Sequence, residues 1–258
     1  MNVALVLTFT RQDLVDRYAS SLLGSVWTLI NPLVQILIYT LIFSKIMGAR
    51  LSDLGVEFNE YGYSIYLVPA VLTWGAFGNT LTRVTTIFQD KAGLIGKVSL
   101  SLRALPLYIL LSETIVFLIS MSLFAIFLLL IGYPITWMWL LLIPVFMVQQ
   151  LLAYSLGFGA AVLGVFVRDV VELVRITVQL WFWLTPIVYV LAILPQETQD
   201  LLAWNPMTHF VTAFRDIILY ARMPDVEALA VLLGVGLCLL AMALYGFKRL
   251  EKELRDFI

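Results

Sequence analysis

The residues from Gly93 to Ser99 read GLIGKVS and are similar in type and spacing to a phosphate-binding loop. Such a loop needs a glycine, four further residues, a Gly-Lys pair and then a serine or threonine whose hydroxyl binds a metal ion. Here the first position is Lys91 and the last is Val98, so two of the four defining residues are absent. The sequence therefore predicts that this chain carries no nucleotide site.

Glu113 is the second residue whose type suggests chemistry, because it is the only charged residue between Arg103 and Arg168. An acid inside a long apolar run is a functional candidate by default, since a charge at membrane depth is costly. A second interpretation makes Glu113 a hydrogen-bonded packing residue, with Gln149 or Gln150 as its partner. Both interpretations stay open at the level of the sequence.

Metal and thiol chemistry have little support in the sequence. The single cysteine, Cys238, excludes an internal disulfide and a CxxC metal or redox pair. A proton-coupled carrier would need a relay, and Glu113 without a histidine in a span is weak support for one. We therefore predict no catalytic residue and no metal ligand.

Composition places these residues in a membrane protein. Hydrophobic residues make up 62% of the chain and the mean hydropathy is +0.97, whereas soluble domains are roughly 45–50% apolar. A helix needs ~20 apolar residues to cross the hydrocarbon layer, so the gaps between charged residues locate the spans. The turn at Gly132-Tyr133-Pro134 divides the longest gap. We predict an all-α membrane protein with spans at 21–44, 61–83, 104–131, 136–167, 176–195 and 228–247, preceded by an interfacial helix at 1–20.

The distribution of basic residues predicts the orientation of these spans. Lys and Arg residues accumulate beside the cytoplasmic ends of spans. With the N-terminus inside, the inner segments hold twelve of the sixteen basic residues and the outer segments hold four. Both chain ends are therefore expected in the cytoplasm.

Two connecting segments have patterns of their own. The inner segment 88–101 alternates apolar and charged residues, which is typical of a short element at the membrane surface. It either contacts anionic lipid or docks a soluble partner. In the outer segment 196–227, Asn205-Pro206 precedes a short amphipathic helix from Thr208 to Tyr220, with Phe210, Phe214, Ile217 and Ile218 opposite His209, Thr212, Arg215 and Asp216. A passive cap at the outer interface is one interpretation of this helix.

Three helix faces carry packing or polar signals. Ala153, Gly157 and Ala161 recur every fourth residue, which lets another helix approach closely. Polar and aromatic residues form a stripe on one side of the first span and another on the fifth. The two stripes are Gly24, Thr28, Asn31, Gln35 and Tyr39, and Thr177, Trp181, Thr185 and Tyr189. These stripes should contact protein or water, and hydrogen bonding between helices is the simpler explanation.

Three separated stretches together carry a resemblance to a known family. They are RQDLVDRYASSLLGSVWTLINPLVQILIYTLIF at 11–43, GLIGKVSLSLRALPL at 93–107, and FVRDVVELVRITVQLWFWLTPIVYVLAILP at 166–195 followed by WNPMTHFVTAFRDIILY at 204–220. Their order and their Arg-Asp, Thr-Pro and Asn-Pro signatures resemble the permease subunit of bacterial polysaccharide and O-antigen ABC exporters of the second type. One departure is that Leu100, Ser101 and Leu102 stand where the family usually has Phe-Pro-Arg, with Arg103 one place later.

The resemblance implies a transport subunit rather than an enzyme, in the cytoplasmic (inner) membrane. It implies a homodimer that binds two copies of a separate ATPase, which would hold ATP and Mg²⁺, so that this chain has no cofactor of its own. The substrate would be a lipid-linked polysaccharide. Membrane lipids would be a further partner, and no binding of nucleic acid is expected. A drug or small-lipid permease of the same architecture, and an ion- or proton-coupled carrier, are the alternatives.

The resemblance also implies roles for particular residues. The coupling segment that docks the ATPase would include Phe88, Asp90, Lys91, Gly93, Leu94, Ile95 and Lys97. The outer gate would include Asn205, Pro206, Phe210, Phe214 and Arg215. The channel lining would be Thr28, Asn31, Gln35, Tyr39, Thr177, Trp181, Thr185 and Tyr189, because amides and hydroxyls exchange hydrogen bonds with sugars and flat rings cover their apolar faces.

The predicted orientation can be tested by thiol labelling in a Cys238→Ser background. Single cysteines at Lys91 and Asp256 should react with impermeant reagents only from the cytoplasm, and cysteines at Asp53 and Glu197 only from outside. The reverse pattern, or different sides for the two inner positions, would contradict the six-span topology.

Overall fold

The structure is a computed structural model that describes residues 3–17, 21–40, 62–95 and 102–257. Within these ranges the chain forms helices joined by turns, with no strand, which confirms the all-α prediction for this part. The α-helices are α1 (Val3–Asp16), α2 (Trp27–Ile38), α4 (Gly62–Asp90), α5 (Ala92–Ile95), α6 (Leu107–Leu130), α7 (Leu142–Phe166), α8 (Asp169–Trp183), α9 (Gln196–Leu202), α10 (Pro206–Ile218) and α11 (Val226–Phe257). Short 3-10 turns occupy Gly24–Val26, Trp137–Leu141 and Leu191–Ile193.

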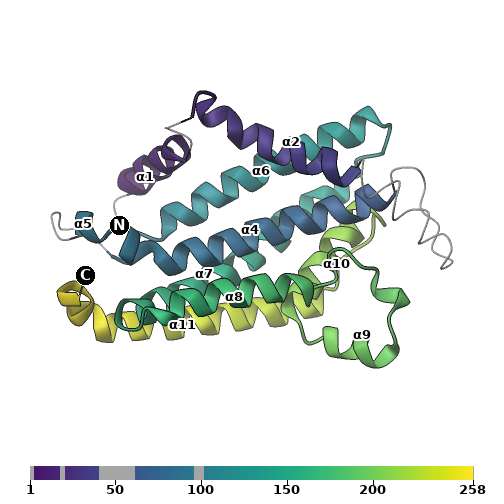
Figure 1. The fold of residues 1–258 in the computed structure, drawn as a ribbon. Coiled ribbons are helices and arrows are strands. Elements are labelled where there is room, and N and C mark those ends of the chain that lie inside the picture. Colours follow the sequence, from purple (N-terminus) through teal and green to yellow (C-terminus); the bar gives the residue numbers. More distant parts are fainter. Residues whose placement is uncertain (1–2, 18–20, 41–61, 96–101, 258) are drawn as a thin grey trace.

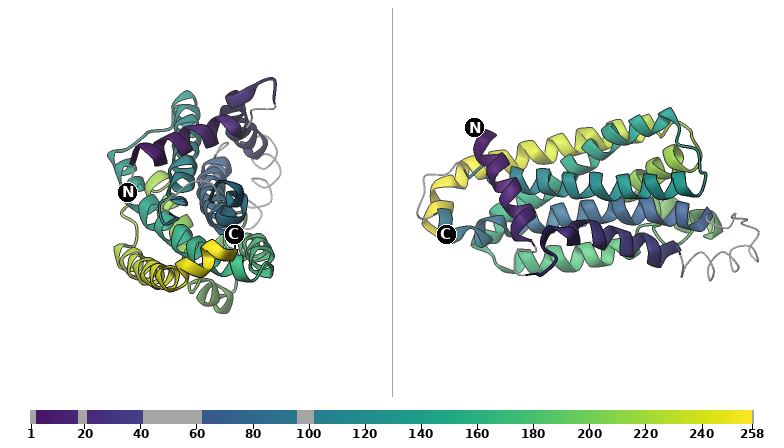
Figure 2. Two further views of the ribbon diagram at one scale, coloured as in Figure 1. Left: turned by 90° about the vertical axis from the view of Figure 1, so that its left-hand side faces the viewer. Right: turned by 90° about the horizontal axis from the view of Figure 1, so that it is seen from above.

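The long helices lie side by side in one bundle, with α7 packed between α4 and α11 (Figure 1). The helix α1 lies across one end of this bundle, and α9 and α10 lie at the other end. Both chain termini and α5 are at the same end as α1 (Figure 2). One side of the bundle, which faces the viewer in Figure 1, is formed by α2, α4 and α8, with α4 in the middle.

Within the described ranges, three helices are long and apolar enough to cross a membrane, at Leu107–Leu130, Trp137–Phe166 and Val226–Arg255. They coincide with the predicted third, fourth and sixth spans, and the last continues beyond 247 into the charged tail. The helix α4, with 29 residues, matches the second predicted span and extends seven residues past its expected end at 83. Of the first predicted span, 21–44, the structure describes the short helix α2, and residues 41–44 lie outside the described ranges.

The fifth predicted span, 176–195, is wrong in its boundaries. The helix α8 begins earlier, at Asp169, and ends at Trp183, after which the chain turns through Thr185–Tyr189. The cause is Pro186, which has no N–H to continue the helix and which disfavours helical geometry at Thr185. The gaps between charged residues mark where an apolar segment lies and how long it is, but they do not show whether the helix within it is interrupted.

The helices α7 and α4 approach each other closely at Gly157 of α7. A Cβ atom added to Gly157 would lie 2.9 Å from the backbone oxygen of Leu81 and 2.9 Å from Cβ of Val84. Ala153 and Ala161, one turn away on each side, are fully buried. The predicted small-residue face is therefore confirmed, and its partner is α4.

This contact predicts opposite outcomes for two glycine substitutions in α7. Gly157→Ala should lower the free energy of unfolding of the detergent-solubilised protein by roughly 1–3 kcal/mol, because the Leu81 backbone cannot move without separating the helices. Gly159→Ala is the matched control, since its Cβ would meet only the Ala243 methyl, at 3.7 Å. This control should be neutral or stabilising, because alanine favours helix by about 1 kcal/mol. Equal effects of the two changes would contradict the close contact.

Candidate functional site

A cavity of about 490 Å³ lies between α2, α4 and α6. From α2 it is lined by Thr28, Asn31 and Gln35, three of the four residues of the predicted lining in the first span. Across the cavity, α4 contributes Asn79 and α6 contributes Ser120. The polar stripe of α2 thus borders a partly open space, and the helix α2 packs more extensively on α6 than on α4.

The stripe of α8 has a different environment. The indole Nε1 of Trp181 donates a 2.7 Å hydrogen bond to Oδ1 of Asn205, and the ring packs edge-on against Phe77 of α4. Thr185 is also buried, whereas Thr177 is exposed and Tyr189 is half-buried beyond the end of the helix. Much of this stripe therefore serves packing.

The two predicted stripes do not meet in one cavity of this chain. None of the α8 residues lines the cavity beside α2. They do belong to the same side of the molecule, because α2 and α8 flank α4 (Figures 1 and 2). Tyr39, the last residue of the α2 stripe, is half-buried and is not among the cavity residues.

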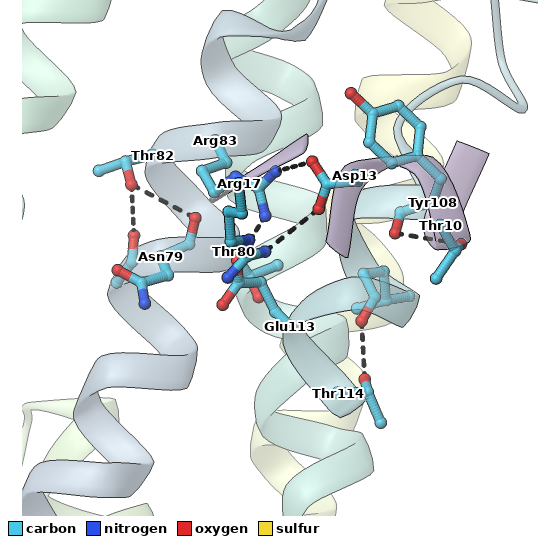
Figure 3. A network of polar contacts seen from close by, with 12 residues as sticks. Thr10, Asp13, Arg17, Asn79, Thr80, Thr82, Arg83, Tyr108, Glu113 and Thr114 are labelled. Atoms are coloured by element: carbon cyan, nitrogen blue, oxygen red, sulfur yellow. Dashed lines mark hydrogen bonds and ion pairs between the residues drawn. The ribbon is translucent and has the colours of Figure 1, made fainter. Parts of the chain in front are cut away.

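Two residues of the cavity lining, Arg17 and Glu113, belong to a cluster of four charged side chains (Figure 3). Oε1 of Glu113, on α6, accepts hydrogen bonds from Nη2 of Arg17 at 2.7 Å and from Nη1 of Arg83 at 2.5 Å. Asp13, on α1, pairs with the same two arginines, at 3.2 Å to Nη2 of Arg17 and through Oδ1 to Nη2 of Arg83. We call these four residues the charge cluster.

The charge cluster has zero net charge, and it compensates a buried carboxylate. Glu113 is only 1% exposed, so its charge would be unfavourable without the two guanidinium groups. Burial alone would raise the pKa of Asp13, but the charge and hydrogen bond of Arg83, together with the charge of Arg17, hold that pKa below its usual value. The Asp13 carboxylate therefore remains an ionised acceptor near neutral pH.

The expected partners of Glu113 were wrong. Nε2 of Gln149 donates to the backbone oxygen of Thr73 at 2.7 Å, and Oε1 of Gln150 accepts from the hydroxyl of Thr80 at 2.8 Å. Both glutamines thus bind α4 rather than α6. The i, i+4 spacing of Asp13 and Arg17 was the one visible signal for the charge cluster, because such pairs meet on a helix.

The described residues of the predicted coupling segment divide into buried and exposed ones. Phe88 is 1% exposed, with its ring edge-on to Phe158 and stacked on Phe247, so its side chain belongs to the core, and its role in docking stays a prediction. Ile95 is also buried. Asp90 and Gly93 are exposed, and Lys91 is half-buried. The side chain of Leu94 and all of Lys97 lie outside the described residues.

Arg103 follows this segment and lies at the surface. Its guanidinium is 3.9 Å from the carboxylate of Glu251 on α11, and it lies 5.5 Å from the ring of Phe247. The side chain is about half exposed.

The predicted outer gate residues hold α10 in place. Oδ1 of Asn205 accepts from the backbone N–H of Met207 and caps the helix, with Pro206 at its first turn. Phe210 and Phe214 are fully buried. Arg215 was expected on a polar outer face, and this is wrong: the side chain is 4% exposed and points into the bundle. The same correction applies to Asp216, which is 7% exposed and accepts from Arg222.

Comparison with known proteins gives consistent matches along the chain. The family model described as ABC-2 type transporter matches residues 4–219. The chain is 27% identical over 256 residues to the O-antigen export system permease protein RfbA of Myxococcus xanthus, covering 98% of this chain and 95% of the relative. It is 25% and 24% identical over 255 residues to two proteins of the same name from Klebsiella pneumoniae, with the same coverage.

The charge cluster predicts that Glu113→Gln strongly destabilises the protein. The substitution removes the more buried of the two carboxylates that Arg17 and Arg83 share, and breaking a buried ion pair costs roughly 3–5 kcal/mol. Glu172→Gln is the matched control, because its pair with Arg175 is exposed. Thermal unfolding in detergent should separate the two variants clearly. Equal melting temperatures would show that the charge cluster does not stabilise the fold.

Proposed function

The chain belongs to the ABC-2 type transporter family, and we propose that it is the transmembrane subunit of an ATP-driven exporter of a lipid-linked polysaccharide. The observation that carries this proposal is the similarity to O-antigen export permeases over 98% of the chain. The polar cavity beside α2 supports it, because its amide and hydroxyl groups suit a hydroxyl-rich cargo.

Energy for transport would come from a separate ATPase subunit, which is the usual partner of a permease in this family. ATP and Mg²⁺ would be bound by that subunit. The surface around Asp90 and Gly93 supports docking at α5, because these two residues are exposed, Lys91 between them is partly accessible, and α5 follows closely on α4. Leu94 remains part of the proposed contact on the basis of the sequence.

The proposed orientation places α1, α5 and both termini in the cytoplasm and α9 and α10 outside. The common position of the termini and α5 at one end of the bundle supports this arrangement. So does the excess of basic residues in the predicted inner segments. Six spans in the cytoplasmic membrane then follow from the three long apolar helices together with α2, α4 and α8.

The proposed path lies between two copies of this chain. In a homodimer, the sides formed by α2, α4 and α8 would face each other and enclose a channel. Thr28, Asn31 and Gln35 would form its wall on α2, and Thr177 and Tyr189 are the accessible members of the stripe that begins on α8. Trp181 and Thr185 would shape this wall from behind, because they bind Asn205 and are turned toward protein.

Gln35 offers the sharpest test, because it lines the cavity and is exposed. Gln35→Leu should slow glycan export by about threefold to tenfold, the range expected for losing one hydrogen-bonding group. Gln35→Asn, which keeps the amide, should retain more export. The assay measures surface glycan in a strain that lacks the chain and is complemented with each variant.

The control for this test is Leu37→Ala on the same helix, outside the cavity lining. It should export normally, and the ATPase should copurify equally with every variant. Unchanged export in Gln35→Leu would exclude α2 as the channel wall. Failure of the wild-type chain to retain any ATPase, or to restore surface glycan, would overturn the proposed function itself.

A further inference from the structure

The chain between α8 and α9 contains an unwound stretch, Leu184–Tyr189, whose middle residues are buried in the bundle. Thr185, Pro186 and Ile187 are buried, so water is not available to their backbone groups. Irregular backbone at membrane depth is tolerated only where protein groups satisfy its hydrogen bonds. The carbonyl oxygens of this stretch therefore need donors from other elements.

Arg215 supplies two of these donors at once. Its Nη1 donates to the oxygen of Pro186 at 2.7 Å, and its Nη2 donates to the oxygen of Ile187 at 2.8 Å. Its Nε donates to the backbone oxygen of Tyr66 at 3.1 Å, and the guanidinium lies 3.4 Å from the centre of the Tyr66 ring. One planar side chain thus joins α10, α4 and the unwound stretch.

Three further side chains complete the set. The hydroxyl of Tyr63 donates to the oxygen of Val188 at 2.6 Å, and that of Tyr66 donates to the oxygen of Tyr189 at 3.1 Å. Nδ2 of Asn205 donates to the oxygen of Leu184 at 3.0 Å. Every carbonyl from Leu184 to Tyr189 except that of Thr185 is therefore held by a side chain, and the Thr185 oxygen accepts from the N–H of Ile187.

The same contacts compensate the buried charge of Arg215. No carboxylate of the described residues lies within ion-pair distance of Arg215, so carbonyl dipoles and an aromatic ring compensate its charge. A buried cation that lost these oxygens would be left unsolvated. The guanidinium and the unwound stretch consequently stabilise each other. Lysine cannot replace this geometry, because it lacks the planar fork of donors.

We propose that Arg215 is a positioning residue for glycan transport: it fixes the Leu184–Tyr189 stretch and thereby sets the place of Tyr189 on the channel wall. The role in transport rests on the proposed function, whereas the fixation of the stretch does not. Arg215 is too buried to touch a passing polymer, so it acts through the residues whose backbone it binds. Within the outer gate segment, Arg215 thus holds the stretch in place from inside the bundle.

The test follows the stretch directly by thiol labelling. Tyr189→Cys in a Cys238→Ser background reports its accessibility, because only the side chain of Tyr189 is changed and its carbonyl remains. Adding Arg215→Leu should raise the labelling rate by about tenfold, the factor expected when hydrogen bonds from a charged donor are lost. Arg215→Lys should give an intermediate rate. In the Tyr189-containing protein, the same two changes should reduce glycan export in the same order.

Two further variants keep the result interpretable. Arg222→Leu is the matched control, because this exposed arginine on the neighbouring turn binds Asp216 and not the stretch, and it should change neither labelling nor export. The double variant Tyr63→Phe, Tyr66→Phe removes two hydroxyl donors without altering charge, and it should also raise the labelling rate. It replaces Arg215→Leu as the test if that variant fails to reach the membrane.

Two results would overturn the proposal. One is an unchanged labelling rate in Arg215→Lys and in the double tyrosine variant. The other is a raised labelling rate with normal export in Arg215→Leu. A wild-type chain that does not support glycan export at all would instead refute the proposed function, and the labelling result would still decide whether Arg215 fixes the stretch.

Discussion

The absence of water from the hydrocarbon layer is the constraint on which this structure depends. A charge or a backbone carbonyl in that environment must be satisfied by the protein itself. Glu113 meets this constraint with two arginines, one following α1 and one from α4, and so the acid joins three separate segments. The unwound stretch after α8 meets it with donors from α4 and α10. In both places the need to satisfy a buried polar group determines which helices lie together.

The helix α4 is common to both places. Near one end it carries Arg83 of the charge cluster, and near the other it carries Tyr63 and Tyr66, which bind the unwound stretch. In the same turn as Arg83, Leu81 and Val84 contact α7 at Gly157, which leaves little freedom for either helix. The helix α2 packs less extensively on α4 than on α6, and the cavity lies between these three helices. A rigid centre beside a loosely packed helix is thus built into the bundle.

The sequence was sufficient to predict what depends on apolar length. Gaps between charges located α6, α7 and α11, and the spacing of Ala153, Gly157 and Ala161 correctly predicted a close helix contact. It was insufficient wherever a polar group is satisfied from far along the chain. The sequence pattern placed Arg215 on an exposed polar face. Its partners in the structure, Pro186 and Ile187, precede it by 29 and 28 residues in the sequence. No local pattern distinguishes an arginine in water from one that binds buried carbonyls, because both alternate with apolar residues in the same way.

The charge cluster also places a constraint on how an ATPase could act on the cavity. The segment proposed to dock the ATPase connects α4 to α6. Arg83 and Glu113, which join those two helices, lie within about two turns of the end of α4 and the start of α6. Because both arginines share one oxygen of Glu113, moving α4 relative to α6 cannot preserve both contacts unless α1 moves as well. Arg17 and Glu113 themselves form part of the cavity wall. In the proposed exporter, a displacement at α5 would therefore reach the glycan path through this cluster, and α1 would move with the wall rather than serve as a passive anchor.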